Sequence, residues 1–263
     1  MIVYSYTPLL VFSVVIAAVL GAVSGSFLNC AGWRIAHGES FVKGKSRCPS
    51  CSHELGALDL IPVFSYVFLG GKCRYCKKKI SPRYLVAELI MAALAVMCVL
   101  FFDLSFLCLR NFLFISCLFC LSVADLEAFI IPNGTLIAAV AVWLAWLPFS
   151  GYGWAEIGLH VLSAAVYGAG VLVLSLIMDK LLKKESLGGG DVKLFFVMGL
   201  YLGLVASLFS VMLSCVIGLL FVLFARKKAG EHFPFGPSIA AATTVMLFCG
   251  DLLTNAYLGL FGG

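Results

Sequence analysis

The sequence predicts an all-α polytopic membrane protein of about eight transmembrane helices, with one small polar insertion between the first two. Of its 263 residues, 62% are hydrophobic and only 12% are charged, whereas a soluble chain is about half apolar and about a quarter charged. A chain of this length cannot bury so much apolar surface in its own core, so lipid must solvate much of it. Long apolar stretches recur along the sequence, and the one long polar segment carries clustered cysteines.

Eight stretches are long enough to cross, or nearly cross, the hydrocarbon core of a bilayer. The apolar run from Leu194 to Ala225 is too long for one span, and Gly199 and Gly203 offer places for a tight turn within it. The sixth span is therefore short. In chain order the expected spans lie near Leu9–Leu28, Tyr84–Phe102, Phe106–Ala124, Ile131–Pro148, Ile157–Met178, Asp191–Gly203, Leu204–Ala225 and Phe235–Leu258.

The basic residues gather in alternate loops, which predicts the orientation of the chain. Eight spans place these loops on one side, and the positive-inside rule makes that side the cytoplasm, with the N- and C-termini outside. The same distribution argues against nucleic acid as a partner, although the net charge is +5. The residues are Arg34, Lys43, Lys45, Arg47, Lys72, Arg74, Lys77, Lys78, Lys79 and Arg83 after the first span, Lys180, Lys183 and Lys184 after the fifth, and Arg226, Lys227 and Lys228 after the seventh.

Three regions are expected along the chain. Residues 1–29 form the first transmembrane helix, residues 30–83 a cytoplasmic domain that carries the cysteines, and residues 84–263 the main transmembrane domain. The middle region is too long and too polar for a simple turn. The first span has no basic residue before it and a basic stretch after it. Since a secretory signal peptide has the reverse pattern, this span is expected to be retained.

Four of the eleven cysteines form two Cys-x-x-Cys pairs in the insertion, Cys48 with Cys51 and Cys73 with Cys76. Two such pairs about twenty residues apart match a tetrahedral four-thiolate zinc site. Disulfides or unbonded thiols are the alternatives, and a reducing cytoplasm disfavours disulfides. No open coordination position is evident, so the expected metal is structural and supplies folding energy to a segment with little core. His53 is a further candidate ligand.

Two aspartates stand at the ends of apolar spans. Asp125 closes the third span and Asp191 opens the sixth, so the expected topology places both at the cytoplasmic surface. An ionisable residue at membrane depth is costly and is a candidate for function. Two carboxyl groups that share one proton can activate a water and polarise a carbonyl. The positive end of a helix dipole favours ionised Asp191, so Asp125 is expected to carry the proton.

Three glycines, Gly188, Gly189 and Gly190, directly precede Asp191. They are expected to let a substrate backbone approach without obstruction, and to allow positive φ angles that expose amide donors. The alternative is structural, because aspartates often cap helices and glycine-rich loops are common turns.

Two glutamates are further candidates for the site. Glu127 could compete with Asp125, although a helical spacing of two directs it elsewhere. Glu88, on the second span, could pair with a buried basic residue or belong to the site.

Taken together, the motifs resemble the bacterial prepilin peptidases, the leader peptidase and N-methyltransferase enzymes of type IV pili, type II secretion and competence systems. The Gly188-x-Gly190-Asp191 element resembles the GxGD signature of intramembrane aspartyl proteases. The resemblance runs nearly end to end. It covers Gly25-Ser26-Phe27-Leu28-Asn29 with Arg34, Ser46-Arg47-Cys48-Pro49-x-Cys51, Ile61-Pro62, Gly71-Lys72-Cys73-Arg74-Tyr75-Cys76, Ile80-Ser81-Pro82-Arg83-Tyr84 to Glu88, Asp125-Leu126-Glu127 with Ile131-Pro132-Asn133, Gly188–Leu194 and Pro234-Phe235-Gly236-Pro237.

The resemblance implies that Asp125 and Asp191 are the catalytic pair of residues 84–263 and that the four cysteines bind zinc. It implies cleavage of prepilin or pseudopilin precursors after the glycine that ends a short basic leader, at the cytoplasmic face of a bacterial inner (plasma) membrane. It also implies N-methylation of the new terminal residue from S-adenosylmethionine, for which the sequence shows no glycine-rich nucleotide motif. The family's usual Leu-Pro after Arg34 is Ile35-Ala36 here, and its usual Asn before Ile-Pro is Leu60.

Two other classes of function compete with this interpretation. A membrane transporter or proton channel would explain buried aspartates, but not two carboxylates at one face or four cysteines in a basic loop. An adaptor that binds partners through the cysteine domain would explain the cysteines, but leaves the glycine loop before Asp191 without a purpose.

Overall fold

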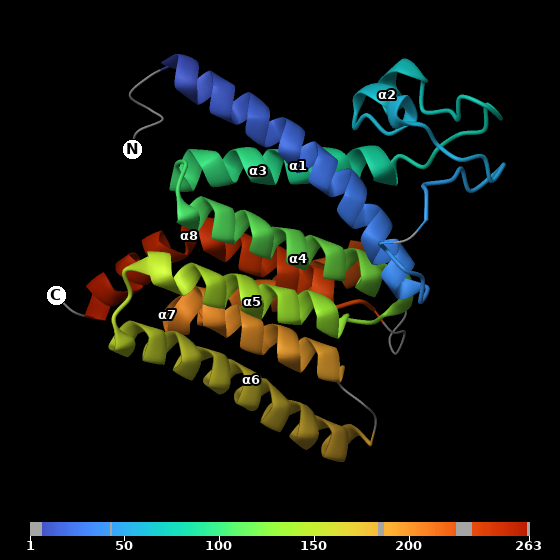
Figure 1. Ribbon diagram of the computed structural model, residues 1–263. Coiled ribbons are helices and arrows are strands. Elements are labelled where there is room, and N and C mark those ends of the chain that lie inside the picture. The colour runs from blue at the N-terminus through green and yellow to red at the C-terminus, as the bar shows by residue number, and fades with distance from the viewer. Residues whose placement is uncertain (1–6, 43, 184–186, 225–232, 262–263) are drawn as a thin grey trace. The chain divides into compact units, whose positions relative to one another are not determined.

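The computed structural model describes residues 7–42, 44–183, 187–224 and 233–261, and its main elements in these ranges are helices (Figure 1). Seven of them are long and apolar enough to cross a membrane. They are α1 (Thr7–Ala36), α3 (Arg83–Phe102), α4 (Phe106–Ala128), α5 (Asn133–Ser150), α6 (Trp154–Leu182), α7 (Gly189–Phe224) and α8 (Gly236–Phe261). The insertion holds a 3-10 helix, η2 (Ala57–Asp59), and a short helix, α2 (Phe64–Phe68). The prediction of an all-α membrane protein is therefore confirmed.

Some residues that carried the predicted orientation lie outside the described ranges. They are Lys43, Lys184, Arg226, Lys227 and Lys228.

The chain divides within α4 into two compact units, Met1–Phe112 and Leu113–Gly263. In the first unit α1 packs on α3 through glycine. A Cβ on Gly25 would lie only 2.6 Å from the carbonyl oxygen of Ala87, so the backbones approach more closely than any larger residue would allow. Arg83, the first residue of α3, donates a hydrogen bond from Nε to Oδ1 of the buried Asn29 at 3.1 Å. This polar contact fixes the start of α3 against α1.

Helix α1 continues to Ala36, whereas the expected span ended near Leu28. The prediction followed hydropathy, which falls at Asn29. The helix continues because several residues of this extension, including Asn29 and Ala31, are buried. Arg34 in the last turn donates hydrogen bonds to carbonyl groups of the following loop.

The core of the second unit surrounds the first part of α7, between Leu194 and Tyr201. Nearly all side chains of this stretch are buried, as expected for a helix that is apolar on every side. The Tyr201 ring stacks on Phe114 of α4 with centroids 3.6 Å apart, and its hydroxyl donates to the Ala139 carbonyl of α5 at 2.8 Å. The segment that begins at Asp191 is thus held by neighbours on several sides.

Helix α7 is interrupted at Gly203, whose φ of 73° and ψ of −175° are not helical. Before the interruption, Gly190 packs on Ile131, and after it Gly218 packs on the start of α8, residues 235–238. Ile131 also contacts the start of α8. Both ends of α7 therefore lie at the same end of the second unit, which means that the chain turns back at Gly203.

This reversal divides the seven helices into eight helical segments and agrees with the short sixth span expected from the sequence. Of the two glycines considered for the turn, Gly203 forms it, whereas Gly199 stays helical. A Cβ on Gly199 would lie 2.8 Å from the Cα of Ala164, so its role is to let α6 approach closely.

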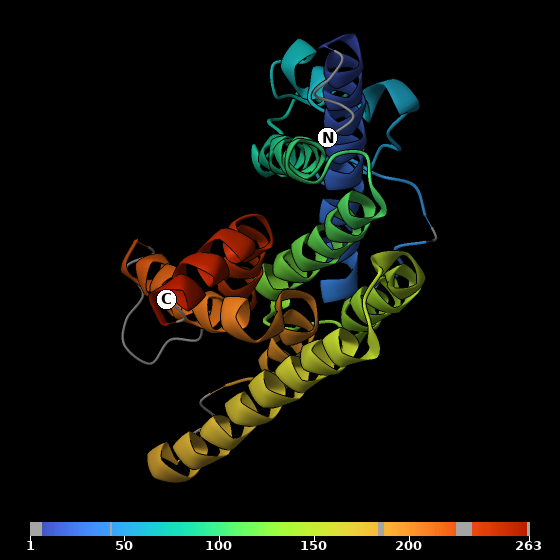
Figure 2. The same cartoon turned by 90° about the vertical axis from the view of Figure 1, so that its left-hand side faces the viewer.

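Two side chains of α6 donate hydrogen bonds to backbone carbonyls on either side of the interruption. His160 donates from Nδ1 to the Leu200 carbonyl at 3.0 Å, since a carbonyl can only accept, and the Tyr167 hydroxyl donates to the Leu204 carbonyl at 2.7 Å. Figure 2 shows α6 as one long unbroken helix of this unit. Its side chains therefore stabilise the turn on both sides of Gly203.

Candidate active site and metal centre

Asp125 lies in the last turn of α4, and its side chain is buried, with a fractional exposure of 5%. Its Oδ2 accepts a hydrogen bond from the backbone amide of Gly236, the first residue of α8, at 2.9 Å. A helix N-terminus has free amides and a partial positive charge, so it is a favourable neighbour for a carboxylate. A Cβ at Gly236 would lie 2.7 Å from the same Oδ2. Glycine is therefore the residue that this contact permits.

Asp191 lies in the first turn of α7, as predicted, and its backbone amide donates to the Gly188 carbonyl at 3.0 Å. Its side chain is half-buried, but its Oδ1 is buried and has no hydrogen-bond partner among the described residues. The Asp125 carboxylate is close enough to act on Asp191 electrostatically. The structure thus brings the two predicted aspartates together and leaves one buried oxygen of Asp191 without a hydrogen-bond partner among the described residues.

Ile131 connects the two halves of this site. Its side chain contacts both Gly190, directly before Asp191, and Gly236, which binds Asp125. In the sequence, Ile131 and Gly236 stood out only as parts of larger motifs, which gave them no role. The proline residues on either side of the Phe235-Gly236 pair are the local signal that a turn and a helix start meet there.

The glycines before Asp191 differ from the expectation. None of Gly188, Gly189 and Gly190 has a positive φ, so conformational freedom does not explain them. A Cβ on Gly190 would lie 2.9 Å from Cβ of Ile131, which makes close packing the reason for glycine there. A Cβ on Gly189 would meet nothing within 4 Å. The substrate-binding role of the three glycines stays a prediction.

The structure accounts for Glu88 within the first unit. Glu88 is buried, and its Oε2 accepts a hydrogen bond from the backbone amide of Val63 at 2.7 Å. Val63 has a φ of 63°, which is unusual for a β-branched residue. Glu88 therefore holds the turn before α2 against α3. Glu127 is half-buried, and its role remains untested.

The two Cys-x-x-Cys pairs adopt the same backbone pattern. The amide of Cys48 donates to the His53 carbonyl, and the amide of Cys73 donates to the Lys78 carbonyl. An isolated β-bridge encloses each pair, Arg47 with Glu54 in the first and Lys72 with Lys79 in the second. The residue directly after each pair, Ser52 or Lys77, has a positive φ. The insertion thus contains two equivalent turns, each of which presents two sulfurs.

The sulfurs of the four cysteines form one group in which all atoms lie within 4.8 Å of one another. Cys48 Sγ and Cys76 Sγ, one from each turn, are 3.9 Å apart. Zn–S bonds of about 2.3 Å in a tetrahedron place sulfurs about 3.8 Å apart, so the donor set fits a metal of this size. The backbone amides of Cys76 and Tyr75 donate to Cys73 and lower its thiol pKa to about 7, which favours its thiolate. At Cys51 the hydrogen bond from the His53 amide is outweighed by burial and by the sulfurs of Cys48 and Cys76, which raise the thiol pKa to about 11.

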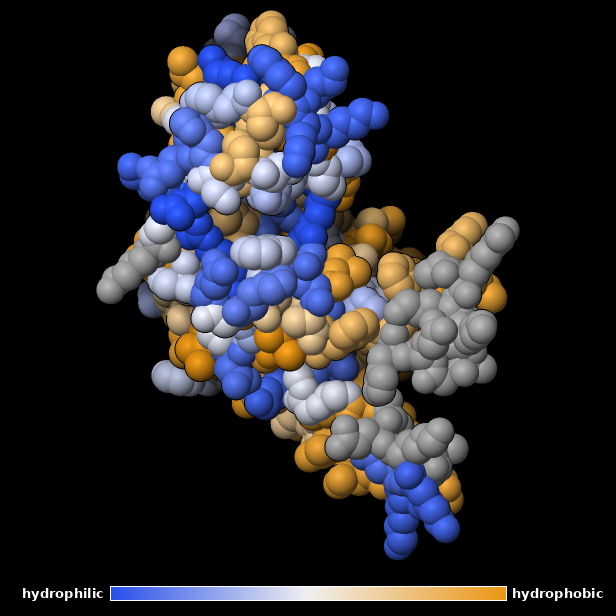
Figure 3. All heavy atoms as spheres, turned by 90° about the vertical axis from the view of Figure 1, so that its right-hand side faces the viewer, coloured by the Kyte–Doolittle hydropathy of each residue, from blue (hydrophilic) through white to orange (hydrophobic). Residues whose placement is uncertain are grey.

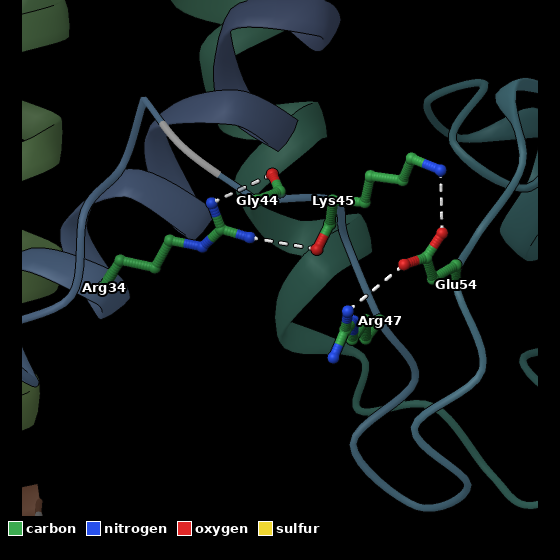
Figure 4. Close-up of polar contacts among 5 residues, drawn as sticks. All are labelled: Arg34, Gly44, Lys45, Arg47 and Glu54. Atoms are coloured by element: carbon green, nitrogen blue, oxygen red, sulfur yellow. Dashed lines mark hydrogen bonds and ion pairs between the residues drawn. The ribbon is translucent and has the colours of Figure 1, made fainter.

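His53 is not part of this group. Its ring lies against Tyr75 instead, with centroids 3.7 Å apart. Exposed basic residues surround the cysteines, and Figure 3 shows the hydrophilic side chains of the insertion gathered on one face. Glu54 forms ion pairs with Lys45 at 2.8 Å and Arg47 at 3.1 Å (Figure 4). These contacts connect the first turn to the chain that leaves α1.

The fold and the site define a class: an integral membrane protein with two aspartates close together at one end of its helices and a four-cysteine group in an insertion. Residues 19–102 match the family model of the bacterial peptidase A24 N-terminal domain, and residues 112–223 match that of the type IV leader peptidase family. The chain belongs to this family of membrane peptidases. Its seven apolar helices and its family together identify it as an integral protein of the inner (plasma) membrane.

Several relatives align with most of the chain. A prepilin leader peptidase/N-methyltransferase of Bacillus subtilis is 33% identical over 244 residues, which cover 91% of this chain and 96% of that protein. Proteins with the same name from Neisseria gonorrhoeae and Burkholderia pseudomallei (strain 1026b) are 28% and 32% identical. They align with 93% and 94% of this chain and with 93% and 87% of their own length. No solved structure matches the chain.

Proposed function

We propose that this protein is an endopeptidase that removes the short basic leader from type IV prepilin-like precursors, cutting after glycine at the cytoplasmic face, and that it also N-methylates the new N-terminal residue. The observation that carries the proposal is the proximity of Asp125 and Asp191 at one end of the second unit. The names of the relatives support both activities. The orientation rests on the basic loops, with both termini outside.

The two carboxyl groups divide the hydrolysis between them. Asp125 lies at the positive end of α8, and its Oδ2 accepts a hydrogen bond from the Gly236 amide, so Asp125 is the ionised member of the pair, in contrast to the expectation from the sequence. It takes a proton from a water, whose oxygen then adds to the carbonyl carbon. Asp191, whose Oδ1 has no hydrogen-bond partner among the described residues, carries the shared proton and donates it to the carbonyl oxygen. The tetrahedral intermediate collapses when Asp191 takes its proton back, the peptide C–N bond breaks and the leaving amine takes the proton that Asp125 accepted from the water.

The metal of the insertion is zinc in this proposal, held by Cys48, Cys51, Cys73 and Cys76. Four thiolates leave no open position, so the ion has a structural role and joins the two equivalent turns. S-adenosylmethionine is the methyl donor. Among the described residues we find no glycine-rich nucleotide loop that fits this donor, and no residue is assigned to it.

The test is a cleavage assay with the purified protein and a prepilin precursor, in which the products are weighed by mass spectrometry. Wild type is expected to release the leader and, with S-adenosylmethionine present, to add one methyl group of about 14 Da. Asp125→Asn and Asp191→Asn are each expected to lose at least a thousandfold in rate, because either change removes a proton acceptor or donor. Asp251→Asn, on the exposed end of α8, is the matched control.

The outcomes separate the competing classes. Full cleavage by both aspartate variants would remove the pair from the mechanism and direct attention to Glu127. If the protein is a transporter, wild type would not cleave the precursor, and the aspartate variants would lose ion flux. If it is an adaptor, both substitutions would leave its function unchanged. A mature product without the added mass of a methyl group would support the peptidase activity and contradict the N-methyltransferase activity.

A further inference from the structure

A groove of about 920 Å³ lies between α5, α6 and the first part of α7. The side chains that line it are almost entirely apolar and come from the second unit alone. On α5 they include Ile137 and Leu144, on α6 Ala165 and Ala169, and on α7 Phe196. The site described above does not use these residues.

The groove begins at the first turn of α7, which also carries Asp191. Val192 and Lys193, which directly follow Asp191, line one end of it. There Lys193 donates a hydrogen bond from Nζ to Oδ1 of Asn133, the first residue of α5, at 2.9 Å. Because α5 runs from Asn133 away from this end, the polar contact marks the mouth of the groove, and the rest of the lining is apolar.

The dimensions suit a helix. The α5 lining extends from Asn133 to Leu144, which at 1.5 Å per residue is roughly 16 Å, or about three helical turns. The α6 wall presents the small residues Ala165, Gly168 and Ala169, and small residues allow another helix to approach closely in a membrane. The opposite wall of α5 carries larger aliphatic side chains that can pack against such a helix.

We propose that this groove binds the hydrophobic helix of the precursor, the segment that follows the scissile bond, while the bond lies at Asp125 and Asp191. The inference rests on the proposed function and adds the site that positions the substrate. A precursor of this type is polar up to the cut and apolar after it. The order along the helices is the same, with Asp191 in the first turn of α7, the Lys193–Asn133 contact at the end of the groove and an apolar channel beyond.

The kinetic test fills the groove with phenylalanine. Ala141 lines it, whereas Ala138, one turn earlier on α5 and also exposed, does not. Ala141→Phe is expected to lower kcat/KM for the full precursor at least tenfold, mainly by raising KM, and Ala138→Phe is expected to match wild type. Ala169→Phe and Val166→Phe form the corresponding pair on α6.

A second measurement does not depend on cleavage. A photocrosslinking amino acid replaces Leu144, in the groove, or Ala138, outside it, in the Asp191→Asn variant, which keeps the precursor uncut. Reconstituted bilayers receive the precursor, and mass spectrometry identifies the crosslinked partner. We expect Leu144 crosslinks to the apolar helix of the precursor, at least tenfold more abundant than those from Ala138.

The possible results distinguish this proposal from the proposed function. If wild type cleaves and Ala141→Phe cleaves as fast as Ala138→Phe, the docking site is wrong and the peptidase stands. Crosslinks from Leu144 to lipid alone, with precursor present, also overturn the docking site. If wild type does not cleave, the proposed function fails, and the crosslinks still decide whether the groove binds the helix.

Discussion

The backbone amide of Gly236 donates a hydrogen bond at 2.9 Å to Oδ2 of Asp125, a residue 111 positions earlier in the chain. This contact places the start of α8 against the end of α4 and engages one carboxyl oxygen of the proposed pair. Ile131 packs beside Gly236 and reaches Gly190, so the positions of the two aspartates depend on a shared set of close contacts.

Gly236→Ala is expected to slow precursor cleavage at least tenfold. Its Cβ would lie 2.7 Å from Oδ2 of Asp125, so either α8 or the carboxylate must shift, and small displacements of reacting groups are costly. Gly134→Ala, in the first turn of α5, is the control, because a Cβ there meets nothing within 4 Å. Cleavage rates and thermal unfolding midpoints of both variants check this. Equal cleavage rates would contradict the proposed importance of the contact.

Gly203→Ala and Gly170→Ala should change stability in opposite directions. Gly203 has φ 73° and ψ −175°, a conformation that only glycine adopts easily, so alanine is expected to destabilise the protein by about 1–3 kcal/mol. Gly170 is exposed within α6, where alanine is expected to stabilise the helix by about 0.5–1 kcal/mol. Unfolding in detergent measures both. A stabilised Gly203→Ala variant would argue against the reversal of α7.

Asp59→Asn is expected to accelerate zinc release to a chelator about tenfold. The Asp59 side chain is only 7% exposed and accepts hydrogen bonds from the Gly56 amide, Arg74 and Tyr75. These contacts connect η2 to the second cysteine turn. Hydrogen bonds to a charged group contribute about 1.5–3 kcal/mol. Glu54→Gln should have less than a threefold effect, because Glu54 is 44% exposed and exposed ion pairs contribute little.

The effect of Asp59 should not vary between pH 6 and pH 8. Burial alone would raise the pKa of Asp59, but the hydrogen bonds from Gly56, Arg74 and Tyr75 outweigh it and lower the pKa. A lowered pKa contributes stability that is present above the unfolded value of about 4 and is lost as the pH falls through the folded value. Asp59 is therefore ionised throughout this range. A release-rate ratio that changes steeply between pH 6 and pH 8 would rule out this account.

Cys73→Ser is expected to purify without zinc, whereas wild type and Cys215→Ser should each hold about one ion per chain. Cys215 is an exposed residue of α7, far from the insertion in sequence, so it controls for the loss of a thiol. Elemental analysis gives the metal content. In Cys73→Ser, backbone hydrogen exchange should rise in residues 46–55 and 71–80 together, because one ion joins both turns in wild type. Loss of protection in only one turn would mean that the turns fold independently.

The proximity of the two aspartates and the grouping of the four cysteines could be predicted, because the signals for both are local in the sequence. Asp125 and Asp191 are ionisable residues at the ends of apolar spans, and the cysteines carry their spacing in the sequence. The interruption of α7 was predicted from the length of one apolar run, and the expected spans already divided at Gly203, where the structure has it.

Long-range packing produced what the sequence could not predict. Nothing near Gly236 indicates that its amide faces Asp125, and nothing near Gly190 indicates that Ile131 excludes a side chain there. Helix α1 continues beyond the predicted span because residues such as Asn29 are buried against neighbours, which hydropathy does not register.

The reversal of α7 at Gly203 has a consequence for biosynthesis. The segment from Gly189 to the turn is about 20 Å long by its helical rise, shorter than the roughly 30 Å hydrocarbon layer, so it is a poor insertion signal alone. It must enter the bilayer as a hairpin with the segment that follows. A nascent chain that ends before Phe224 lacks part of this hairpin, so the segment that carries Asp191 is expected to insert stably, and to meet Asp125, only late in translation.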